Sequence, residues 1–248
     1  MSTAKGRTTK PASTPTRSFD AFAETFDRFA ELVGAPLAQY VEGALPAHGA
    51  RAVDLGCGTG RHATLLASRY REVLGVDVSE SMLQVARARR NLPGITYQQR
   101  DLCTLTTAAD GRFDLVFSAY TLHHVPDLDA TLQRIRELVA PGGLVVLIDN
   151  VAPRPAVPRR WFVGEAVRLL ALDLLRRRRP PAEAFEVFRL NTNRQWLDHL
   201  TTDRFLDRSE FERRYGRAFP GARFTSMYRA HALRWDAPGP GGEGSEET

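Results

Sequence analysis

The sequence predicts an α/β fold, a doubly wound sheet of about seven strands with helices on its faces. Two observations support this prediction. Apolar runs of strand length alternate with helix-length segments, an order that favours parallel strands joined by helical crossovers. Residues 113–118 are mostly apolar, as expected for a central strand that is buried on both faces. The expected strands are residues 51–55, 73–77, 95–99, 113–118, 144–149, 223–228 and 231–235.

The expected helices follow from apolar side chains that recur at three- and four-residue steps. Residues 19–45 show such a pattern, and Pro36 can break or restart that helix. In the last expected helix, Ser209 is the predicted N-cap and Glu212 its capping-box partner. The other expected helices are residues 62–70, 79–90, 129–139, 161–175, 190–199 and 208–215.

A glycine-rich turn, Gly56-Cys57-Gly58-Thr59-Gly60, joins the first strand to the first crossover helix. Glycine lets the backbone approach a ligand closely, and the helix that follows offers free N–H groups. The spacing G-x-G-x-G differs from the G-x-G-x-x-G of dinucleotide folds, and no phosphate-binding G-x-x-x-x-G-K-[ST] is present. Asp54, just before the glycines, suits a cationic ligand group better than a pyrophosphate. The turn therefore predicts a cofactor cradle.

A second acid, Asp77, ends the second strand beside this turn. A carboxylate at that place can accept hydrogen bonds from both hydroxyls of a ribose. The alternative is that Asp77 caps the next helix, a role that Ser79 or Ser81 could also fill.

Five segments in order, from Val53 to Asp149, resemble class I S-adenosylmethionine-dependent methyltransferases of the type 11-like, small-molecule kind. They are VDLGCGTG, VLGVDVSESML, QQRDL, FDLVFSAYTLHHV and PGGLVVLID. The resemblance implies a Rossmann-like sheet that is mostly parallel with an antiparallel last strand. It implies S-adenosylmethionine as the cofactor. It also implies a helical acceptor-binding cap, residues 153–200, inserted after the fifth strand.

The resemblance also implies roles for individual residues. Val78 and Met82 would flank the adenine; as an alternative, Met82 is a core residue. Asp101 would accept a hydrogen bond from the adenine amine, and the N–H of Leu102 would serve a ring nitrogen; as an alternative, Asp101 is a turn residue. The implied cofactor-binding residues are Asp54, Gly56, Gly58, Gly60, Asp77, Val78, Met82, Asp101, Leu102 and Ser118. Phe26-Asp27 lies where the family often has a Tyr-Asp pair, so a polar contact from that ring is in doubt, and packing on the sheet is the alternative.

The segment after the fourth strand would face the transferred methyl, because ligands bind at the carboxyl ends of strands in such sheets. His123 is the first titratable ring there, and histidine is a suitable base near neutral pH. We predict His123 as the general base, followed by His199 and Tyr120, and no bound metal. The segment lacks the D/N-P-P-Y/F tetrapeptide and the Pro-Cys pair of nucleic-acid methylases. A small-molecule acceptor is therefore expected.

The basic residues are unevenly distributed. Residues 1–18 carry four basic residues and no acid, and residues 154–179 carry eight Arg against two acids, within a chain of net charge +5. The rest of the chain is therefore acidic overall, and we expect no nucleic-acid partner. The methyltransferase domain is expected at residues 19–235, between a disordered basic tail (1–18) and a disordered acidic tail (236–248). The sequence does not predict an oligomeric state.

Three features bear on location. Cys57 and Cys103 are read as free thiols, no apolar run reaches the length of a membrane span, and the start lacks the apolar core of a secretory signal. We therefore predict a cytoplasmic protein. The apolar residues 161–175 followed by the run Arg176–Arg179 allow another reading, a helix that lies on a membrane surface.

Three other functions stay open beside small-molecule methyl transfer. The acceptor could be a lipid or a quinone-like molecule at the membrane surface. The chain could be a cyclase or a binding protein that keeps the cofactor pocket without transferring a methyl group. It could also act on RNA through its basic segments.

Overall fold

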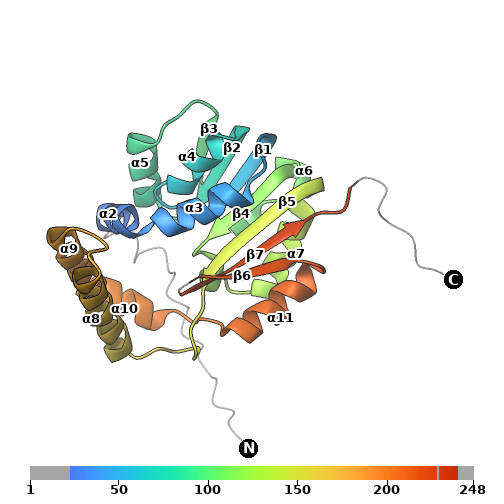
Figure 1. Ribbon diagram of the computed structural model, residues 1–248. Helices are drawn as coiled ribbons and strands as arrows, with labels where there is room; N and C mark the ends of the chain where they lie inside the picture. The colour runs from blue at the N-terminus through green and yellow to red at the C-terminus, as the bar shows by residue number, and fades with distance from the viewer. Residues whose placement is uncertain (1–22, 228, 240–248) are drawn as a thin grey trace, which may run out of the picture.

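The computed structural model describes residues 23–227 and 229–239, and Figure 1 shows their arrangement. In this part of the chain seven strands form one sheet, in the order β3-β2-β1-β4-β5-β7-β6. The pairs among β1 to β5 are parallel, and β7 is antiparallel to both of its neighbours. The strands are β1 (Gly49–Leu55), β2 (Tyr70–Asp77), β3 (Ile95–Gln99), β4 (Phe113–Ala119), β5 (Val139–Asn150), β6 (Arg223–Ser226) and β7 (Ala230–Asp236). The predicted fold class is confirmed.

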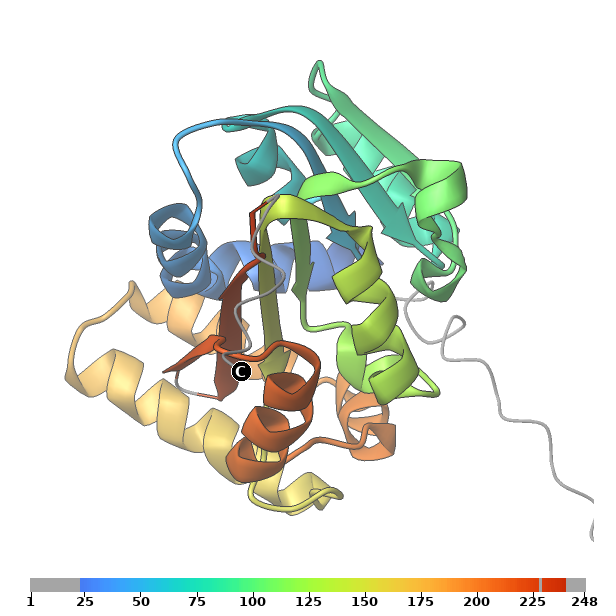
Figure 2. The same cartoon turned by 90° about the vertical axis from the view of Figure 1, so that its right-hand side faces the viewer.

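Helices cover both faces of the sheet, as Figure 2 shows from the side. One face packs against α3 (Ala35–Ala44), α4 (Arg61–Ala67) and α5 (Glu80–Arg89). The other face packs against α7 (Leu128–Leu138) and α11 (Arg208–Ala218), with the short η1 (Leu102–Thr104) and α6 (Thr107–Asp110) nearby. Two buried clusters, one on each face, form the core, so the sheet is the middle of three layers.

A helical cap follows the carboxyl end of β5. It consists of α8 (Arg159–Leu175), α9 (Pro181–Asn191) and α10 (Arg194–Thr202), and it has a small apolar core of its own that includes Phe162 and Leu197. The N-terminal helix α2 (Ala23–Val33) packs beside α9, and Arg28 forms an ion pair with Glu186 there (Figure 1). The cap therefore stands at the edge of the sheet where β4 and β5 end. None of the described helices is long and apolar enough to cross a membrane.

Several boundaries differ from those predicted. The first crossover helix ends at Ala67, and Tyr70 already begins β2. The segment before β1 is two helices, because α3 restarts at Ala35 with Pro36 in its first turn. The expected helix at residues 190–199 is interrupted, since the Asn193 side chain caps a new helix by accepting hydrogen bonds from the next turn.

The N-cap predicted for the last helix is wrong. The Asp207 side chain caps α11 by accepting a hydrogen bond from the Glu210 N–H (2.8 Å), so Ser209 lies inside the helix. Glu212 is not a capping partner either, because its carboxylate pairs with His231 (2.8 Å). The expected acidic tail also begins later, since Asp236 is the last residue of β7. The expected basic tail at residues 1–18 lies outside the described residues.

Candidate active site

The glycine turn has three glycines with left-handed backbone angles, φ +73° at Gly56, +51° at Gly58 and +80° at Gly60. A Cβ on Gly56 would lie 2.3 Å from the Thr121 hydroxyl oxygen, and one on Gly60 would lie 2.4 Å from the Tyr97 hydroxyl oxygen. A Cβ on Gly58 would meet nothing within 4 Å. Two of the glycines therefore allow close packing, while Gly58 borders open space in which a ligand can approach the backbone.

Asp54 lies at the end of β1 directly below this turn and is almost completely buried. Its Oδ2 atom accepts no hydrogen bond from the described residues, and burial, with the nearby Asp77 charge, raises its pKa to about 8. A buried carboxylate oxygen without a donor is costly, so such a group fits a ligand that brings its own positive charge. The predicted role of Asp54 beside a cationic cofactor group agrees with this arrangement.

Asp77 holds the turn together. One carboxylate oxygen accepts a hydrogen bond from the Gly58 N–H (2.8 Å), and the other accepts one from the Ser79 N–H (2.9 Å). Ser79, not Asp77, caps α5 with its side chain. Asp77 therefore fixes the cradle at Gly58, and its predicted contact with a ribose stays a prediction.

The other predicted cofactor residues differ in burial and in hydrogen bonding. Val78 is exposed, while Met82 is buried with Ala23 and Val85 beneath α2. One oxygen of Asp101 accepts a hydrogen bond from the Cys103 N–H (2.8 Å) and so caps η1, whose first residue, Leu102, is buried. Ser118 is buried and donates its hydroxyl to the Leu55 carbonyl (2.8 Å), which joins β4 to β1. The contacts predicted for these residues with the cofactor stay predictions.

Asp27 ties α2 to the glycine turn, a role that the sequence did not predict. Its buried carboxylate accepts a hydrogen bond from the Thr59 hydroxyl (2.8 Å) and forms ion pairs with Arg89 (2.8 Å) and Arg90 (2.9 Å). Burial opposes its ionisation, but these hydrogen bonds outweigh burial and lower the pKa of Asp27. Phe26, its neighbour, packs its ring 6.0 Å from that of Trp196 in the cap and against the cluster that contains Met82, so it does not pack on the sheet as the alternative had it.

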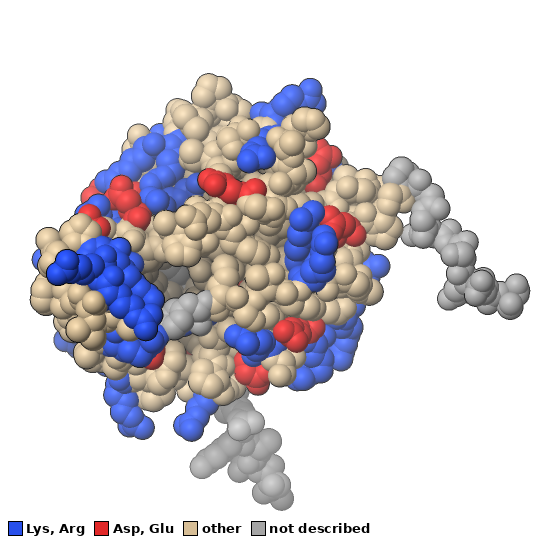
Figure 3. Space-filling view, viewed as in Figure 1, with Lys and Arg blue, Asp and Glu red and all other residues tan. Residues whose placement is uncertain are grey.

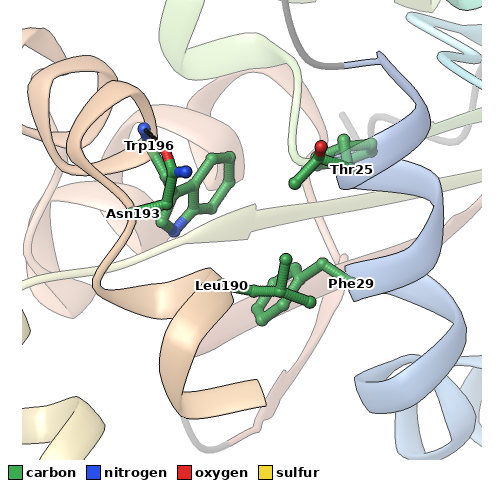
Figure 4. A pocket seen from close by; sticks show the side chains of 6 residues that line it. Thr25, Phe29, Leu190, Asn193 and Trp196 are labelled. Atoms are coloured by element: carbon green, nitrogen blue, oxygen red, sulfur yellow. Dashed lines mark hydrogen bonds between the residues drawn. The ribbon is translucent and has the colours of Figure 1, made fainter. Parts of the chain in front are cut away.

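The N-terminal helix and the cap meet around this tryptophan. Figure 4 shows Thr25 and Phe29 of α2 facing Leu190, Asn193 and Trp196. The cavity between them has a volume of only about 10 Å³, about enough for one water. The two elements are therefore closely packed and form one wall beside the site.

The segment after β4 brings the predicted catalytic residues together. It contains η2 (Leu122–His124) and is linked to the glycine turn, because the Thr121 hydroxyl donates to the Gly56 carbonyl (3.3 Å). Tyr120 adopts a left-handed backbone (φ +58°) that is uncommon for a bulky residue, and its N–H donates to the Ile148 carbonyl. Burial, together with the Asp149 charge, raises the pKa of Tyr120 to about 12, so its hydroxyl stays protonated at neutral pH.

His123 lies between two carboxylates. Its Nδ1 is 2.5 Å from Asp149 Oδ1 at the end of β5, and its Nε2 is 3.7 Å from Asp203 Oδ2 after α10. Burial works against the charged ring, but Asp149 and then Asp203 outweigh it and raise the pKa of His123. Asp149 therefore orients the imidazole and stabilises the imidazolium, as a carboxylate does for a catalytic histidine. The sequence did not predict either acid as a partner of His123.

Two more histidines surround Asp203. His124 Nδ1 is 3.5 Å from Asp203 Oδ1, and His199 Nε2 is 3.6 Å from Asp203 Oδ2. Burial, with the neighbouring His123 charge, lowers the pKa of His124 to about 2 and that of His199 to about 4, so both are neutral at pH 7. Burial raises the pKa of Asp203 to about 6. In the described part of the chain, His123, His124 and Asp203 bring ligand-type atoms within 4.8 Å of one another, close enough for a metal ion; the prediction of no metal is untested.

A larger cavity, of about 360 Å³, opens on the cap side of β5 and β7. Its lining includes Trp161 of α8, which the sequence placed in the acceptor-binding cap, and Arg229, which it did not single out. The cavity lies at the low end of the usual size range for small-molecule sites. The residues that line it are Val151, Ala152, Pro153, Trp161, Glu165, Arg168, Asp207, Arg208 and Arg229.

Comparison with known proteins shows similarity to methyltransferases. Residues 53–147 match the family model described as a methyltransferase domain. A trans-aconitate 2-methyltransferase of Methylobacterium nodulans is 39% identical over 136 residues, which are 52% of this chain and 51% of that protein. A ubiquinone biosynthesis O-methyltransferase of Cereibacter sphaeroides is 35% identical over 121 residues, 48% of this chain and 49% of that protein. The chain thus spans about half the length of these curated relatives.

The similarity to solved structures covers more of the chain. A structure of DhpI in complex with SAH covers 92% of this chain and 96% of its own, with a TM-score of 0.62 and 20% identity. The fold is therefore the Rossmann-like fold of class I methyltransferases. Residues 53–147 match a methyltransferase domain, which confirms over these residues the resemblance predicted from the sequence.

Proposed function

We propose that this protein transfers a methyl group from S-adenosylmethionine to a small-molecule acceptor. The observation that supports this most strongly is that the glycine cradle and the His123–Asp149 pair adjoin. They follow β1 and β4, neighbouring parallel strands in which Leu55 pairs with Ser118, and the Thr121–Gly56 hydrogen bond connects them. A cofactor held by the glycine cradle would have its reacting end near the His123–Asp149 pair.

The residues of the cradle fit this cofactor. The open side of Gly58 leaves room for the cofactor against the backbone, and the unpaired Asp54 oxygen suits its positive charge. Asp77 would hold the ribose hydroxyls, Val78 and Met82 would flank the adenine, and Asp101 with the Leu102 N–H would meet its polar edge. The close packing at Gly56 and Gly60 would shape the turn, and the Ser118 hydroxyl would hold the end of β1 beneath it. When bound, S-adenosylmethionine supplies an electrophilic methyl group.

Methyl transfer of this kind is an in-line displacement, so the protein's main contribution is to hold the acceptor close and aligned. Positioning of this sort contributes up to about 7–11 kcal/mol in well-oriented systems. For a hydroxyl acceptor, we propose that His123 takes the proton at Nε2, with Asp149 fixing the ring through Nδ1. Such a base contributes about 10²–10⁴-fold in rate. His199 and Tyr120 line the same region; His199 is the next candidate base, and Tyr120 is suited to donating a hydrogen bond.

The acceptor is proposed to bind between the sheet edge and the cap, residues 153–200. The trans-aconitate 2-methyltransferase named above has a small-molecule acceptor by its name, which supports this proposal, whereas the name of the ubiquinone biosynthesis O-methyltransferase agrees with the second candidate acceptor below. We propose a small, water-soluble acceptor for this chain and keep the cytoplasm as its predicted location.

A second candidate acceptor, a lipid or quinone-like molecule at a membrane surface, is favoured by one observation. Leu175 at the end of α8 is 82% exposed, and Phe185 on α9 is 55% exposed. The exposed Arg176, Arg177 and Arg178 follow Leu175, and Figure 3 shows basic side chains gathered over α8 and α9. Arg179, by contrast, pairs with Asp173 (3.0 Å) and is not available to a headgroup.

The experiment that tests the proposal uses S-adenosylmethionine with an isotope-labelled methyl group in a cell extract. The extract is then separated into water-soluble small molecules, lipids and RNA. We expect label in the water-soluble fraction, with loss of that label in the His123→Ala protein if the acceptor is a hydroxyl. Label in the lipid fraction, with flotation of the protein on anionic liposomes, would support the second candidate. The absence of label from both the water-soluble and the lipid fractions would contradict methyl transfer to a small molecule or a lipid.

A further inference from the structure

We propose that Arg229 binds an oxyanion group of the acceptor, of the carboxylate or phosphate class, and so selects anionic substrates. This inference rests on the proposed function, because it names the chemistry of the molecule that the cap encloses. Three observations support it. The Arg229 guanidinium lies beside two aromatic rings, the acids of the same cavity already have other partners, and Arg229 lies beside the end of the strand that carries Asp149.

Arg229 is fixed at the start of β7. Its carbonyl accepts a hydrogen bond from the Val151 N–H (2.9 Å), which anchors its backbone to the chain just beyond β5. Its guanidinium lies 4.7 Å from the ring centroid of Trp161 and 5.4 Å from that of Phe162, both on α8. Aromatic rings hold a guanidinium in place without neutralising its charge.

Among the described residues none accepts a hydrogen bond from the Arg229 guanidinium or forms an ion pair with it, and the nearby Glu165 acts on it only through its charge. Burial lowers its pKa, although it remains charged at neutral pH. A partly buried cation that lacks a carboxylate partner is costly to maintain, and an anionic ligand removes this cost. The planar guanidinium matches the two oxygens of a carboxylate or phosphate.

The two acids that line the same cavity are already engaged. Glu165 forms a bidentate pair with Arg168, with distances of 3.1–3.3 Å. Asp207 caps α11 through the Glu210 N–H. Glu165 acts on Arg229 through its charge but forms no described ion pair with it. Two cations of the cavity lining, Arg208 and Arg229, lack a carboxylate partner among the described residues, and of these Arg208 is exposed whereas Arg229 is partly buried beside the indole of Trp161.

The register of the sheet brings this cation close to the proposed reaction site. Residues 149 and 150 of β5 pair with residues 231 and 230 of β7, so Arg229 lies beside the end of β5. Asp149, the partner of His123, belongs to the same strand end. The charge of Arg229 also acts on Tyr120 across this edge. An acceptor whose anionic group binds Arg229 would thus extend toward Tyr120 and His123.

The test compares Arg229→Gln with Arg208→Gln, a matched variant that removes another cation from the same cavity wall. Titration calorimetry in the presence of SAH measures binding of inorganic phosphate and, separately, of succinate, with sodium chloride controlling for ionic strength. We expect saturable binding of at least one of these probes to the wild type. Arg229→Gln should weaken it by about tenfold or more, as for the loss of a charge-assisted hydrogen bond, and Arg208→Gln by much less. The two probes distinguish a phosphate-type from a carboxylate-type acceptor.

Arg229→Lys provides a second variant that keeps the charge. It should retain weaker binding if Arg229 recognises the anion, and this result does not depend on the folding of the glutamine variant. Equal loss in Arg229→Gln and Arg208→Gln, or no saturable binding of either probe to the wild type, would overturn the inference. If the wild type binds SAH but neither anion, only this inference fails; if it does not bind SAH, the proposed function fails as well.

Discussion

Replacing Asp149 by asparagine tests the pair at the centre of the site without knowledge of the acceptor. The asparagine side chain has nearly the same size but no charge, so the hydrogen bond to His123 Nδ1, now 2.5 Å, becomes a neutral one. Hydrogen bonds to charged groups contribute about 1.5–3 kcal/mol, and neutral ones about 0.5–1.5 kcal/mol. Both side chains are nearly buried, with 6% and 5% exposure, so solvent screens this interaction little.

The sign of the pH dependence follows from the raised pKa of His123. Its folded-state pKa lies above the unfolded value of about 6.5. Below about pH 6.5 the His123–Asp149 pair therefore makes its whole contribution to the free energy of unfolding. This contribution decreases as the pH rises through the folded-state pKa. The free energy of unfolding of Asp149→Asn should therefore be lower than that of the wild type by about 1.5–3 kcal/mol near pH 6, and by less at pH 9.

Urea denaturation at several pH values from 6 to 9 measures this difference. Asp198→Asn is the matched control, because Asp198 is an exposed acid on α10 that pairs with Arg159 at the surface. Its effect should be small and nearly independent of pH in this range. A difference between Asp149→Asn and the wild type that is constant, or that grows as the pH rises, would refute the raised pKa of His123 beside Asp149.

The remaining predictions concern the cradle, the cap and the absence of a metal. Gly58→Ala should weaken S-adenosylmethionine binding in calorimetry by far more than Gly142→Ala. Both glycines have a positive φ and open space, but only Gly58 borders the cradle. Equal effects would mean that backbone strain alone explains the Gly58 variant. Asp77→Ala should weaken cofactor binding by about 1.5–3 kcal/mol, and unchanged affinity in a folded variant would remove its ribose role. Trp161→Ala should raise the acceptor KM more than the cofactor Kd, since Trp161 lines the larger cavity, whereas equal changes would indicate a stability defect. Dialysis against a chelator should leave the rate of methyl transfer unchanged, and a loss that zinc restores would show that His123, His124 and Asp203 bind a metal.

The sequence predicts much of the fold because strands and glycine turns are local features. The buried runs of β1 and β4 and the turn at Gly56 can be read from neighbouring residues, and the structure has them within two residues of their expected bounds. The fifth strand was expected at residues 144–149, but β5 already begins at Val139. The caps were harder to predict, since Asp207 and Ser209 are both good capping residues and the local pattern does not decide between them.

The partners of the site residues could not be predicted, because they come from distant parts of the chain. His123 is 26 residues from Asp149 and 80 from Asp203, and only the folded sheet and cap bring the three together. Asp27 meets Thr59 and Arg90 for the same reason. Arg229 had no sequence signal at all among the many arginines; its distinguishing feature is the position of its partly buried guanidinium beside the rings of Trp161 and Phe162, which only the folded chain brings together.

The most direct test of the account is a side-by-side titration of the wild-type protein with S-adenosylmethionine and with NAD⁺. The G-x-G-x-G turn, the open side of Gly58 and the unpaired oxygen of Asp54 favour a compact cationic cofactor over a pyrophosphate. We predict saturable binding of one S-adenosylmethionine per chain and none of NAD⁺. Binding of NAD⁺ without S-adenosylmethionine, or of neither, would contradict the proposed cofactor site and the methyl transfer that depends on it.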